Sequence, residues 1–429
     1  MIKKKQKEGT DTDRLIFHVD VNSAFLSWEA MRRVKRGEAD LRLVPSCIGG
    51  DPSSRRSIVV AKSIPAKKYG VTTGEPVSAA MRKCPGLIVV PSDFRLYAQC
   101  SAAFKDICRL YAPAVEEFSI DGCFLDMTGT GRIYPDPIAT AHEIKDRIRE
   151  ELGFTVNVGV GRSKLCAKMA SDFEKPDRVH TLFPEEIREK MWPLPVGDLL
   201  FVGKAAVRKL DAARIRTIGE MAQADPELLA RLLGEKMSVQ ARNYANGIDD
   251  SPVLSEPEAP KGYSNEITLE DNVTAWEAAE TILAALSDSV AQRMREDGVR
   301  AYSISVTIRY PDFRTRSHQC TLKEAVDTNR AVFETSKRLL EEIWKDRQPL
   351  RLMGVAATKL TREAGAQQMS FLDDPNREKR ERDEKLDRAM DTLKKRFGQD
   401  VIRRGSVMSM GIDVARKHRG EAEKNERDD

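Results

Sequence analysis

Hydrophobic positions in the first half of the chain follow strand and helix periods in turn. The apolar run 14–19 ends at Asp20 and is followed by polar residues, which predicts a buried strand with a turn at its end. The predicted elements are a strand at 14–19, a helix at 94–114, a strand pair at 115–127 with its tip at Asp121 and Gly122, a helix at 142–152 and a strand at 155–160. This order predicts a split βαβ, ferredoxin-like sheet.

The second half begins with short helical segments and continues into a second mixed region. Residues 251–261 (SPVLSEPEAPK) hold three prolines and few large apolar residues, as a linker would. The helices are predicted at 207–213, 218–224, 226–233 and 276–294, with a strand at 302–310. After 361 the apolar content falls sharply, and 376–397 is highly charged with helical spacing of its few apolar residues. We expect a mobile tail that carries a surface helix.

Composition restricts the class of protein. A chain of 429 residues is expected to form two to four domains. Hydrophobic residues make up 41% and charged residues 32%, which is typical of globular proteins. No segment approaches the roughly 18 uninterrupted apolar residues of a membrane span, and the polar start of the chain does not resemble a leader. We therefore expect an intracellular, cytoplasmic protein with no membrane partner.

The cysteines and the net charge restrict the class of protein less than the length and the hydrophobic content do. The 7 cysteines are scattered without a C-x-x-C pair, which argues against a zinc site or a disulfide framework and favours buried thiols. The net charge of +4 neither requires nor excludes nucleic acid. Basic residues gather at 204–216 and 293–316, where they suit phosphate contacts; a merely solvated charged surface explains them equally well.

Two carboxylates stand at predicted strand ends. Asp20 follows the first strand, and Asp121 lies in the strand pair, so a sheet can bring the two together at one edge. Paired carboxylates hold Mg²⁺, a hard cation that shares its shell with substrate phosphates. Aspartates at strand ends are more often caps or turn formers, so spacing alone leaves both interpretations open.

The sequence segments around these aspartates resemble the motifs of Y-family (DinB/UmuC-like, polymerase IV-like) translesion DNA polymerases, in order and in spacing. The motifs are HVDVNSAF at 18–25, AKSIPAKKYG at 61–70, SIDGCFLD at 119–126, VGVGRSKLCAK at 158–168 and EKP at 174–176. The resemblance extends from about residue 15 to 372 and includes NGID at 246–249 with SPV at 251–253.

This resemblance implies an α+β multidomain right-hand polymerase. Its parts would be a ferredoxin-like palm at 14–40 and 88–193, small fingers at 41–87, a helical helix-hairpin-helix thumb at 194–252, a linker at 253–261, an α+β little finger at 262–360 and a tail at 361–429. The implied reaction is template-directed DNA synthesis from deoxynucleoside triphosphates on a primed DNA template by two-metal nucleotidyl transfer, by a monomer.

The family's palm binds two Mg²⁺ ions, and the resemblance assigns residues of this chain to that role. Asp20 and Asp121 stand at the catalytic and metal-binding positions, and the backbone carbonyl of Val21 would complete one shell. Phe25 matches the aromatic steric gate against a ribose 2′-hydroxyl; a plain core aromatic is the other interpretation.

The family also assigns two lysines to the nucleotide. Lys175 matches a lysine that meets the triphosphate, although a surface lysine would look the same. Lys67 stands where the family usually has an arginine, so charge is retained and bidentate geometry is lost. Ile64 replaces a usual tyrosine. The triphosphate should therefore be held by fewer hydrogen bonds.

Gly122 is the main departure from the family. The usual pattern is Ser-x-Asp-Glu, whose Glu is a ligand of the metal that activates the primer 3′-hydroxyl. Asp126 and Glu117 are near in sequence, but Asp126 is expected to face away from Asp121 and to be structural. A water can complete a Mg²⁺ shell. We expect reduced catalysis with DNA binding intact.

Further motifs imply contacts with DNA and with a sliding clamp. Gly203 and Lys204 resemble a helix-hairpin-helix turn whose backbone contacts phosphates, although Phe201 replaces its first glycine. Arg309, Arg314 and Thr315 match a little-finger strand that grips the template backbone; a solvated edge strand is the alternative. The stretch 368–372 resembles the pentapeptide that docks on the clamp, with its contacts from Gln368, Met369, Phe371 and Leu372.

Two other functions remain in view. A catalytically disabled polymerase homologue that occupies DNA and the clamp would explain Gly122 but not the retained Asp20 and Asp121. A nucleotidyl cyclase built on a similar palm would have no use for the thumb, little finger and clamp motif.

Overall fold

The computed structural model describes residues 14–362, 377–398 and 401–402. These residues form two compact units, and the chain passes from the first to the second between Pro257 and Glu258. The stretch Ser53–Arg56 belongs to the second unit. The passage falls within the proline-rich stretch 251–261.

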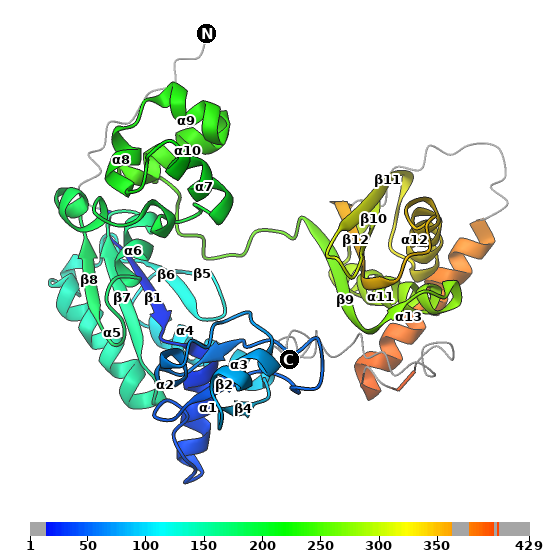
Figure 1. Cartoon of the computed structure of the whole chain (residues 1–429), viewed down its shortest axis with the longest axis horizontal. Helices are drawn as coiled ribbons and strands as arrows, with labels where there is room; N and C mark the ends of the chain where they lie inside the picture. Colours follow the sequence, from blue (N-terminus) through cyan, green and yellow to red (C-terminus); the bar gives the residue numbers. More distant parts are fainter. Residues whose placement is uncertain (1–13, 363–376, 399–400, 403–429) are drawn as a thin grey trace. The chain divides into compact units, whose positions relative to one another are not determined.

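A mixed five-stranded sheet is the centre of the first unit (Figure 1). Its order is β5-β6-β1-β7-β8, and each neighbouring pair is antiparallel except β7 with β8. The strands are β1 (Ile16–Val21), β5 (Ala114–Glu117), β6 (Gly122–Asp126), β7 (Val156–Gly161) and β8 (Val179–Leu182). The predicted strand pair is therefore the hairpin of β5 and β6, and its turn holds Asp121.

Helices cover both faces of this sheet. Phe17, Val19 and Val21 on one face of β1 are buried with residues of α1 (Ala24–Lys35), α4 (Phe94–Arg109) and α5 (Pro137–Leu152). The opposite face is covered by the short helix α6 (Lys164–Ser171), which packs on β1, β7 and β8. The sheet is thus covered on both sides, which explains why nearly every residue of β1 and every residue of β7 is buried.

Side-chain caps explain where several helices begin. Asp93 caps α4 by accepting a hydrogen bond from Leu96 N, and Asp136 caps α5 in the same way. Ser163 caps α6 through Cys166 N. These oxygens satisfy backbone N–H groups that have no partner within the helix. The helix predicted at 142–152 therefore begins earlier, at Pro137.

Two smaller parts complete the first unit. A three-stranded sheet, β3-β2-β4, is formed by β2 (Ser46–Ile48), β3 (Ala61–Lys62) and β4 (Ile88–Val90), with α2 (Ile64–Lys68) and α3 (Val77–Lys83) beside it. A helical part follows with α7 (Lys204–Ala212), α8 (Ile218–Gln223), α9 (Pro226–Leu233) and α10 (Glu235–Ala245). Single turns of other helix types lie at Thr130–Arg132, Pro184–Glu186, Ile187–Met191 and Val196–Asp198.

The second unit is a four-stranded antiparallel sheet with two helices on one face. The strand order is β11-β10-β12-β9. Its elements are β9 (Gly262–Val273), α11 (Trp276–Glu296), β10 (Arg300–Arg309), β11 (Thr315–Val326), α12 (Asn329–Ile343) and β12 (Leu350–Thr361). The strand β11 is an edge, and most of its residues are exposed.

Helix α13 (Arg377–Phe397) packs on this second unit by its charged side. Asp387 and Lys394 are buried, whereas Leu386 and Phe397 are 55% and 59% exposed. Arg295 on α11, with a side chain only 8% exposed, pairs with Asp387 at 3.3 Å and with Asp391 at 2.6 Å. The expected surface helix exists, and buried ion pairs attach it to α11.

Six of the cysteines are buried, but Cys320 on the edge strand β11 is partly exposed, so the expectation of buried thiols is wrong there. Within the described ranges, the helices are all too short or too polar to span a bilayer.

Candidate active site

The end of β1 places Asp20 beside α6. Alternate residues of a strand face opposite sides of its sheet, so His18 and Asp20 share the face of Ile16, which packs against Ala167 of α6. The helix approaches closely because Gly159 on β7 has no side chain: a Cβ there would lie 2.0 Å from the Ala167 carbonyl oxygen. This glycine lets α6 bring its polar residues to the end of β1.

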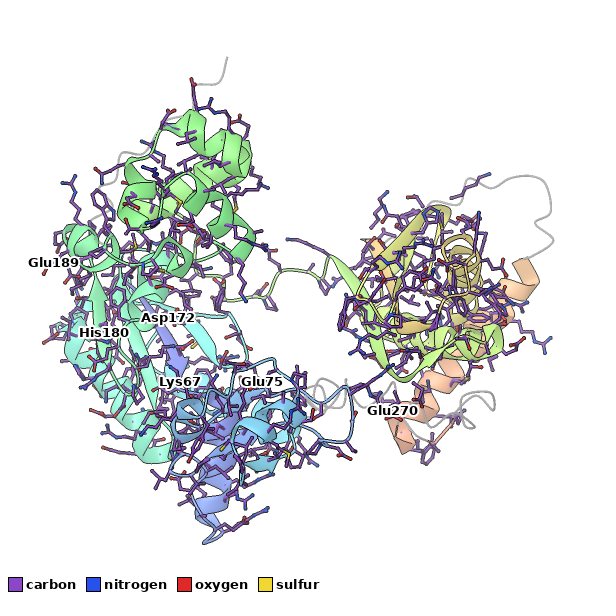
Figure 2. The ribbon with its side chains drawn as sticks, in the orientation of Figure 1. Lys67, Glu75, Asp172, His180, Glu189 and Glu270 are labelled. Atoms are coloured by element: carbon purple, nitrogen blue, oxygen red, sulfur yellow. The ribbon has the colours of Figure 1, made fainter. Side chains whose placement is uncertain are left out.

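Two lysines contact the Asp20 carboxylate. Lys168 Nζ lies 3.1 Å from Oδ1, and Lys175 Nζ lies 2.5 Å from Oδ2. Both lysines also pair with Asp172, which is labelled just beyond α6 in Figure 2. Burial disfavours the charged form of Lys175, but attraction to Asp20 outweighs it, so the pKa of Lys175 lies above its usual value. A metal ion and two ammonium groups would therefore compete for the same carboxylate.

The β5–β6 turn brings Asp121 to the same end of the sheet. The Asp121 carbonyl oxygen accepts a hydrogen bond from Val21 N at 2.8 Å. Its Oδ1 accepts a hydrogen bond from Ser119 Oγ at 2.6 Å. Gly122, the next residue, pairs with Asp20 across β1 and β6. Two carboxylates that are distant in sequence thus lie at the same end of the sheet, as their positions at strand ends had indicated.

Asp20 and Asp121 supply only some of the ligands that a hard divalent cation needs. Across the described ranges, no group of three or more His, Cys, Asp and Glu side chains is placed to hold a metal ion. A Mg²⁺ ion needs only one or two carboxylates when waters and substrate phosphates fill the rest of its shell. Asp20 and Asp121 fit such an ion, whereas Gly122 offers no side chain to a second one.

The nearby acidic residues do not replace the missing ligand. Asp126 pairs with Ile16, so it lies four residues, about 13 Å, along the strand from the level of Asp20 and Gly122. It accepts a hydrogen bond from Thr128 N at 2.9 Å and so shapes a turn, as expected of a structural carboxylate. Glu117 pairs with Lys105 at 3.0 Å on the helix α4.

His18 is a buried polar residue beneath Asp20. Its ring is fully buried, lies 4.6 Å from the Phe124 ring and has Nδ1 2.8 Å from Ser171 Oγ. Burial lowers the pKa of His18 well below its usual value, and the Lys168 ammonium group lowers it further. The ring is therefore neutral at physiological pH.

Phe25 is held in a fixed orientation by other aromatic rings. It stacks on Tyr97 with 4.6 Å between ring centroids and meets Trp28 and Phe94 edge-on. Phe25 itself is only partly buried, whereas Tyr97 and Trp28 are fully buried. A rigid aromatic surface near the end of β1 can exclude a substituent by size, and packing into the core contributes to its rigidity.

Lys67 lies on α2, where Figure 2 labels it. Its helix is capped by Ser63, which accepts a hydrogen bond from Ala66 N. Lys67 is exposed, and Ile64 on the same helix is 64% exposed although it is a large apolar residue. Ile64, at the position where the resemblance implies a tyrosine, is therefore an exposed apolar residue.

Phe201 has a backbone conformation that glycine usually adopts, at the position where the resemblance implies a glycine. Phe201 has φ of 68°, in the left-handed region that glycine prefers, and its side chain is 60% exposed. Gly203 precedes α7 as its N-cap, and Lys204 is the first helical residue. The chain therefore turns before α7 with Phe201 in a strained backbone conformation.

In the second unit, Arg309 and Thr315 pair across β10 and β11. Arg309 Nε donates a hydrogen bond to Thr315 Oγ1 at 2.9 Å. Arg314 is 60% exposed and pairs with Asp312 at the hairpin tip, and its guanidinium lies 5.5 Å from the Tyr310 ring centroid. The three residues form a polar hairpin end on an edge strand. The predicted clamp-binding residues Gln368, Met369, Phe371 and Leu372 lie outside the described residues.

Sequence reasoning missed Lys168, Ser171 and His18 as parts of this site. Lys168 and His18 fall inside the quoted motifs, but their residue types alone do not indicate that Lys168 contacts Asp20 or that His18 meets Ser171 of α6. The spacing of Lys168, Ser171 and Asp172 on one helix was a signal that could have been used. The strand that this face of α6 contacts depends on the close approach of α6 to Gly159 on β7.

Comparison with known proteins agrees with this geometry. Residues 19–172 match the impB/mucB/samB family, and residues 260–371 match the C-terminal domain of that family. A solved Y-family DNA polymerase chimera superposes with a TM-score of 0.72 at 21% identity, covering 81% of this chain and 100% of its own. The predicted fold class, a right-hand polymerase architecture, is confirmed at the level of the fold.

The chain therefore belongs to the Y family of DNA polymerases, in its DinB-like branch. Among its relatives is DNA polymerase IV of Clostridium acetobutylicum, 43% identical over 92% of this chain and 98% of the relative. DNA polymerase IV of Acetivibrio thermocellus is 34% identical with the same coverage. DNA polymerase IV 1 of Bacillus subtilis is 35% identical over 92% of this chain and 93% of the relative.

Proposed function

We propose that this chain adds deoxynucleotides to a primer end under the direction of a DNA template, including opposite damaged bases, and releases pyrophosphate. The relatives named DNA polymerase IV support this activity. The observation that carries the proposal is the meeting of Asp20, Asp121, Lys168 and Lys175 at one end of the sheet. Carboxylates beside ammonium groups can bind both a divalent cation and a triphosphate.

Each residue has a distinct task in the proposed reaction. Asp20, Asp121 and the carbonyl oxygen of Val21 would hold Mg²⁺, two ions when substrate is bound. When bound, the ions make the 3′-hydroxyl a better nucleophile and offset charge on the triphosphate. Lys175 is the more exposed of the two lysines on Asp20, at 36% against 13%, so it can turn to the phosphates while Lys168 stays with Asp20.

Phe25 and Lys67 would select and orient the nucleotide. The Phe25 ring, fixed by Tyr97 and Trp28, supports a role as the surface against which a ribose 2′-hydroxyl would clash. Lys67 would contribute a point charge to the phosphates without the planar fork of an arginine. Fewer directional hydrogen bonds on the triphosphate should weaken nucleotide binding.

Gly122 is the residue that should lower the rate of primer extension. A missing carboxylate weakens one metal site, so the chain should extend primers slowly while it binds DNA normally. A catalytically disabled homologue that occupies primer ends is the second candidate, and the absence of a side chain at Gly122 is the observation that favours it.

Contacts with DNA and a clamp complete the proposal. Gly203 and Lys204 would meet phosphates at the start of α7, and Arg309, Arg314 and Thr315 would grip the template backbone. Residues 368–372 would tether the chain to a sliding clamp. We propose that the chain acts as a monomer in the cytoplasm.

Primer extension in Mg²⁺ tests both candidates. The assay compares the chain as given with Gly122→Glu and Asp121→Ala on an undamaged template. Extension by the chain that Asp121→Ala abolishes supports the polymerase. Extension by the Gly122→Glu variant alone supports the disabled homologue, and failure of all three to extend a primer that they bind contradicts the proposed site.

A further inference from the structure

The loop that carries Lys175 joins the end of α6 to the start of β8, and one side chain of β7 fastens it to the sheet. That residue, Asn157, is fully buried and lies opposite Asp20 in the pairing of β1 with β7. Its Nδ2 donates hydrogen bonds to the Ser171 carbonyl oxygen at 3.2 Å and to the Glu174 carbonyl oxygen at 2.9 Å. The amide thus holds the loop backbone at the residue just before Lys175.

The oxygen of the same amide holds the loop beyond Lys175. Asn157 Oδ1 accepts hydrogen bonds from Arg178 N at 3.2 Å and from Asn22 Nδ2 at 3.1 Å. Asn22 is also buried, and its Oδ1 accepts a hydrogen bond from Asp177 N at 3.0 Å. A side-chain amide has two hydrogens on nitrogen and two lone pairs on oxygen, so these four hydrogen bonds use the full capacity of Asn157.

Asp177 adds an attachment to another element. Its carboxylate pairs with Lys145 at 3.0 Å and with Arg149 at 2.7 Å, both on α5. Its φ of 60° lies in the left-handed region, a sparsely populated conformation that persists only where neighbouring contacts hold it. The loop backbone is therefore fixed on both sides of Lys175, while the Lys175 side chain itself stays partly exposed.

We propose that Asn157, assisted by Asn22, positions Lys175 for the triphosphate of the incoming nucleotide. The inference rests on the proposed function, since it concerns the lysine assigned there to the phosphates. A loop that is already ordered loses less conformational freedom when its lysine binds a phosphate, so the hydrogen bonds to its backbone favour nucleotide binding indirectly. Asn157 is a positioning residue, because its amide is fully used on the loop and on Asn22.

Equilibrium binding of the deoxynucleoside triphosphate that matches the template tests this role without catalysis. The full chain is bound in Mg²⁺ to a primer-template whose primer lacks a 3′-hydroxyl. Asn157→Leu keeps a similar volume and removes all four hydrogen bonds, so it should raise the nucleotide Kd about threefold to tenfold and leave the Kd for DNA unchanged. In the Lys175→Met variant, Asn157→Leu should raise the nucleotide Kd no further. Asn22→Leu keeps the hydrogen bonds of Asn157 to Glu174 and Arg178 and should have a smaller effect.

A core substitution and a second readout separate positioning from general destabilisation. Ile148→Val removes one methyl group from the buried side of α5, and it should lower the melting temperature without changing the nucleotide Kd. Hydrogen exchange needs no nucleotide: in Asn157→Leu the amides of Asp177 and Arg178 should lose protection, while those of β1 keep it. If Asn157→Leu does not fold, Asn22→Leu is measured in both assays, with loss of protection at Asp177 expected.

Additive effects of Asn157→Leu and Lys175→Met on the nucleotide Kd, or unchanged exchange of the loop amides, would overturn the positioning role. An equal rise of the Kd in Ile148→Val would also overturn it, because general destabilisation would then explain the effect. Failure of the proposed function looks different: the unsubstituted chain would bind no nucleotide on the primer-template, or would bind it equally well after Lys175→Met, although Asn157 still protects the loop.

Discussion

Asp20 on β1 lies directly opposite Gly122 on β6, and the two residues share one face of the sheet. Side chains at opposite positions of an antiparallel pair are neighbours, with Cβ atoms about 5 Å apart. A side chain at position 122 would therefore extend beside the Asp20 carboxylate. The position that lacks a side chain, Gly122, is thus a direct neighbour of Asp20.

Restoring a carboxylate at this position should accelerate synthesis. We expect Gly122→Glu to raise the single-turnover rate of primer extension in Mg²⁺ by about 10²-fold, the scale on which one electrostatic contact in an active site acts. The new Cβ needs only small shifts of two side chains, His18 and Ser119. Gly122→Gln is the matched control, because it adds similar volume without charge and should stay near the starting rate. Equal rates for the two variants would rule out a metal role for position 122.

Removing the Lys175 ammonium group should affect the nucleotide rather than the DNA. Lys175→Met should raise KM for the incoming nucleotide about tenfold or more, because a hydrogen bond to a charged group contributes about 1.5–3 kcal/mol. Lys175→Arg keeps the charge and should recover part of the affinity. Nucleotide titrations at fixed primer-template measure KM, and fluorescence anisotropy measures the Kd for DNA. A change in that Kd without a change in KM would place Lys175 on the DNA instead.

His18 should make the first unit sensitive to mild acid. In the unfolded chain a histidine binds a proton near pH 6.5, whereas the pKa of folded His18 is far lower. Below the unfolded value, the unfolded chain therefore holds a proton that the folded chain does not. The free energy of unfolding should fall as pH decreases, by at most about 1.4 kcal/mol per pH unit from this residue.

Denaturant titrations of the full chain from about pH 7.5 to about pH 5 measure this slope. His18→Phe keeps ring packing against Phe118 and Phe124 and should flatten the curve in that range. An unchanged slope in the variant would show that other groups cause the acid sensitivity.

The strained backbone at Phe201 should be relieved by glycine. A non-glycine residue at a φ of 68° costs about 1–2 kcal/mol of stability. Glycine removes this cost, but its greater conformational freedom in the unfolded chain offsets part of the stabilisation. Phe201→Gly should therefore stabilise the chain by up to about 1 kcal/mol. Phe201→Ala removes the same exposed ring and keeps the strain, so it serves as the control in thermal unfolding. Stabilisation by both substitutions alike would attribute the effect to the ring and not to the backbone.

Buried ion pairs should hold α13 in place. Arg295→Met leaves Asp387 and Asp391 without their shared cation, and loss of one partner of a buried pair costs about 3–5 kcal/mol. We expect the variant to expose the many basic residues of α13 to trypsin at low salt, while the Arg388→Met control on the outer side of the helix, with a side chain 69% exposed, stays protected. Equal digestion of both variants would contradict the attachment by ion pairs.

The sequence by itself determined the local elements and the family. The strand at β1, the β5–β6 hairpin, the helices α4 and α5 and the strand β7 were all predicted from short-range periodicity, with errors of a few residues at their ends. Two carboxylates at strand ends could also be found, because a strand end is a local feature. Helix α1, which follows β1 directly, was not predicted from the pattern.

Only the tertiary structure decided which polar groups meet. The contact of Lys168 with Asp20 requires α6 to lie directly on Gly159, and the position of Gly122 opposite Asp20 depends on the register of β1 and β6. Helix α13 shows the same limit, since its periodicity predicted a surface helix but did not indicate that Asp387 and Lys394 are buried on it. Hydrophobic periodicity predicts whether a segment is a helix or a strand, but not which element it packs against. Strand register and helix packing are set by contacts between distant segments of the chain. Those contacts determine both the residues of the site and the charged residues that are buried.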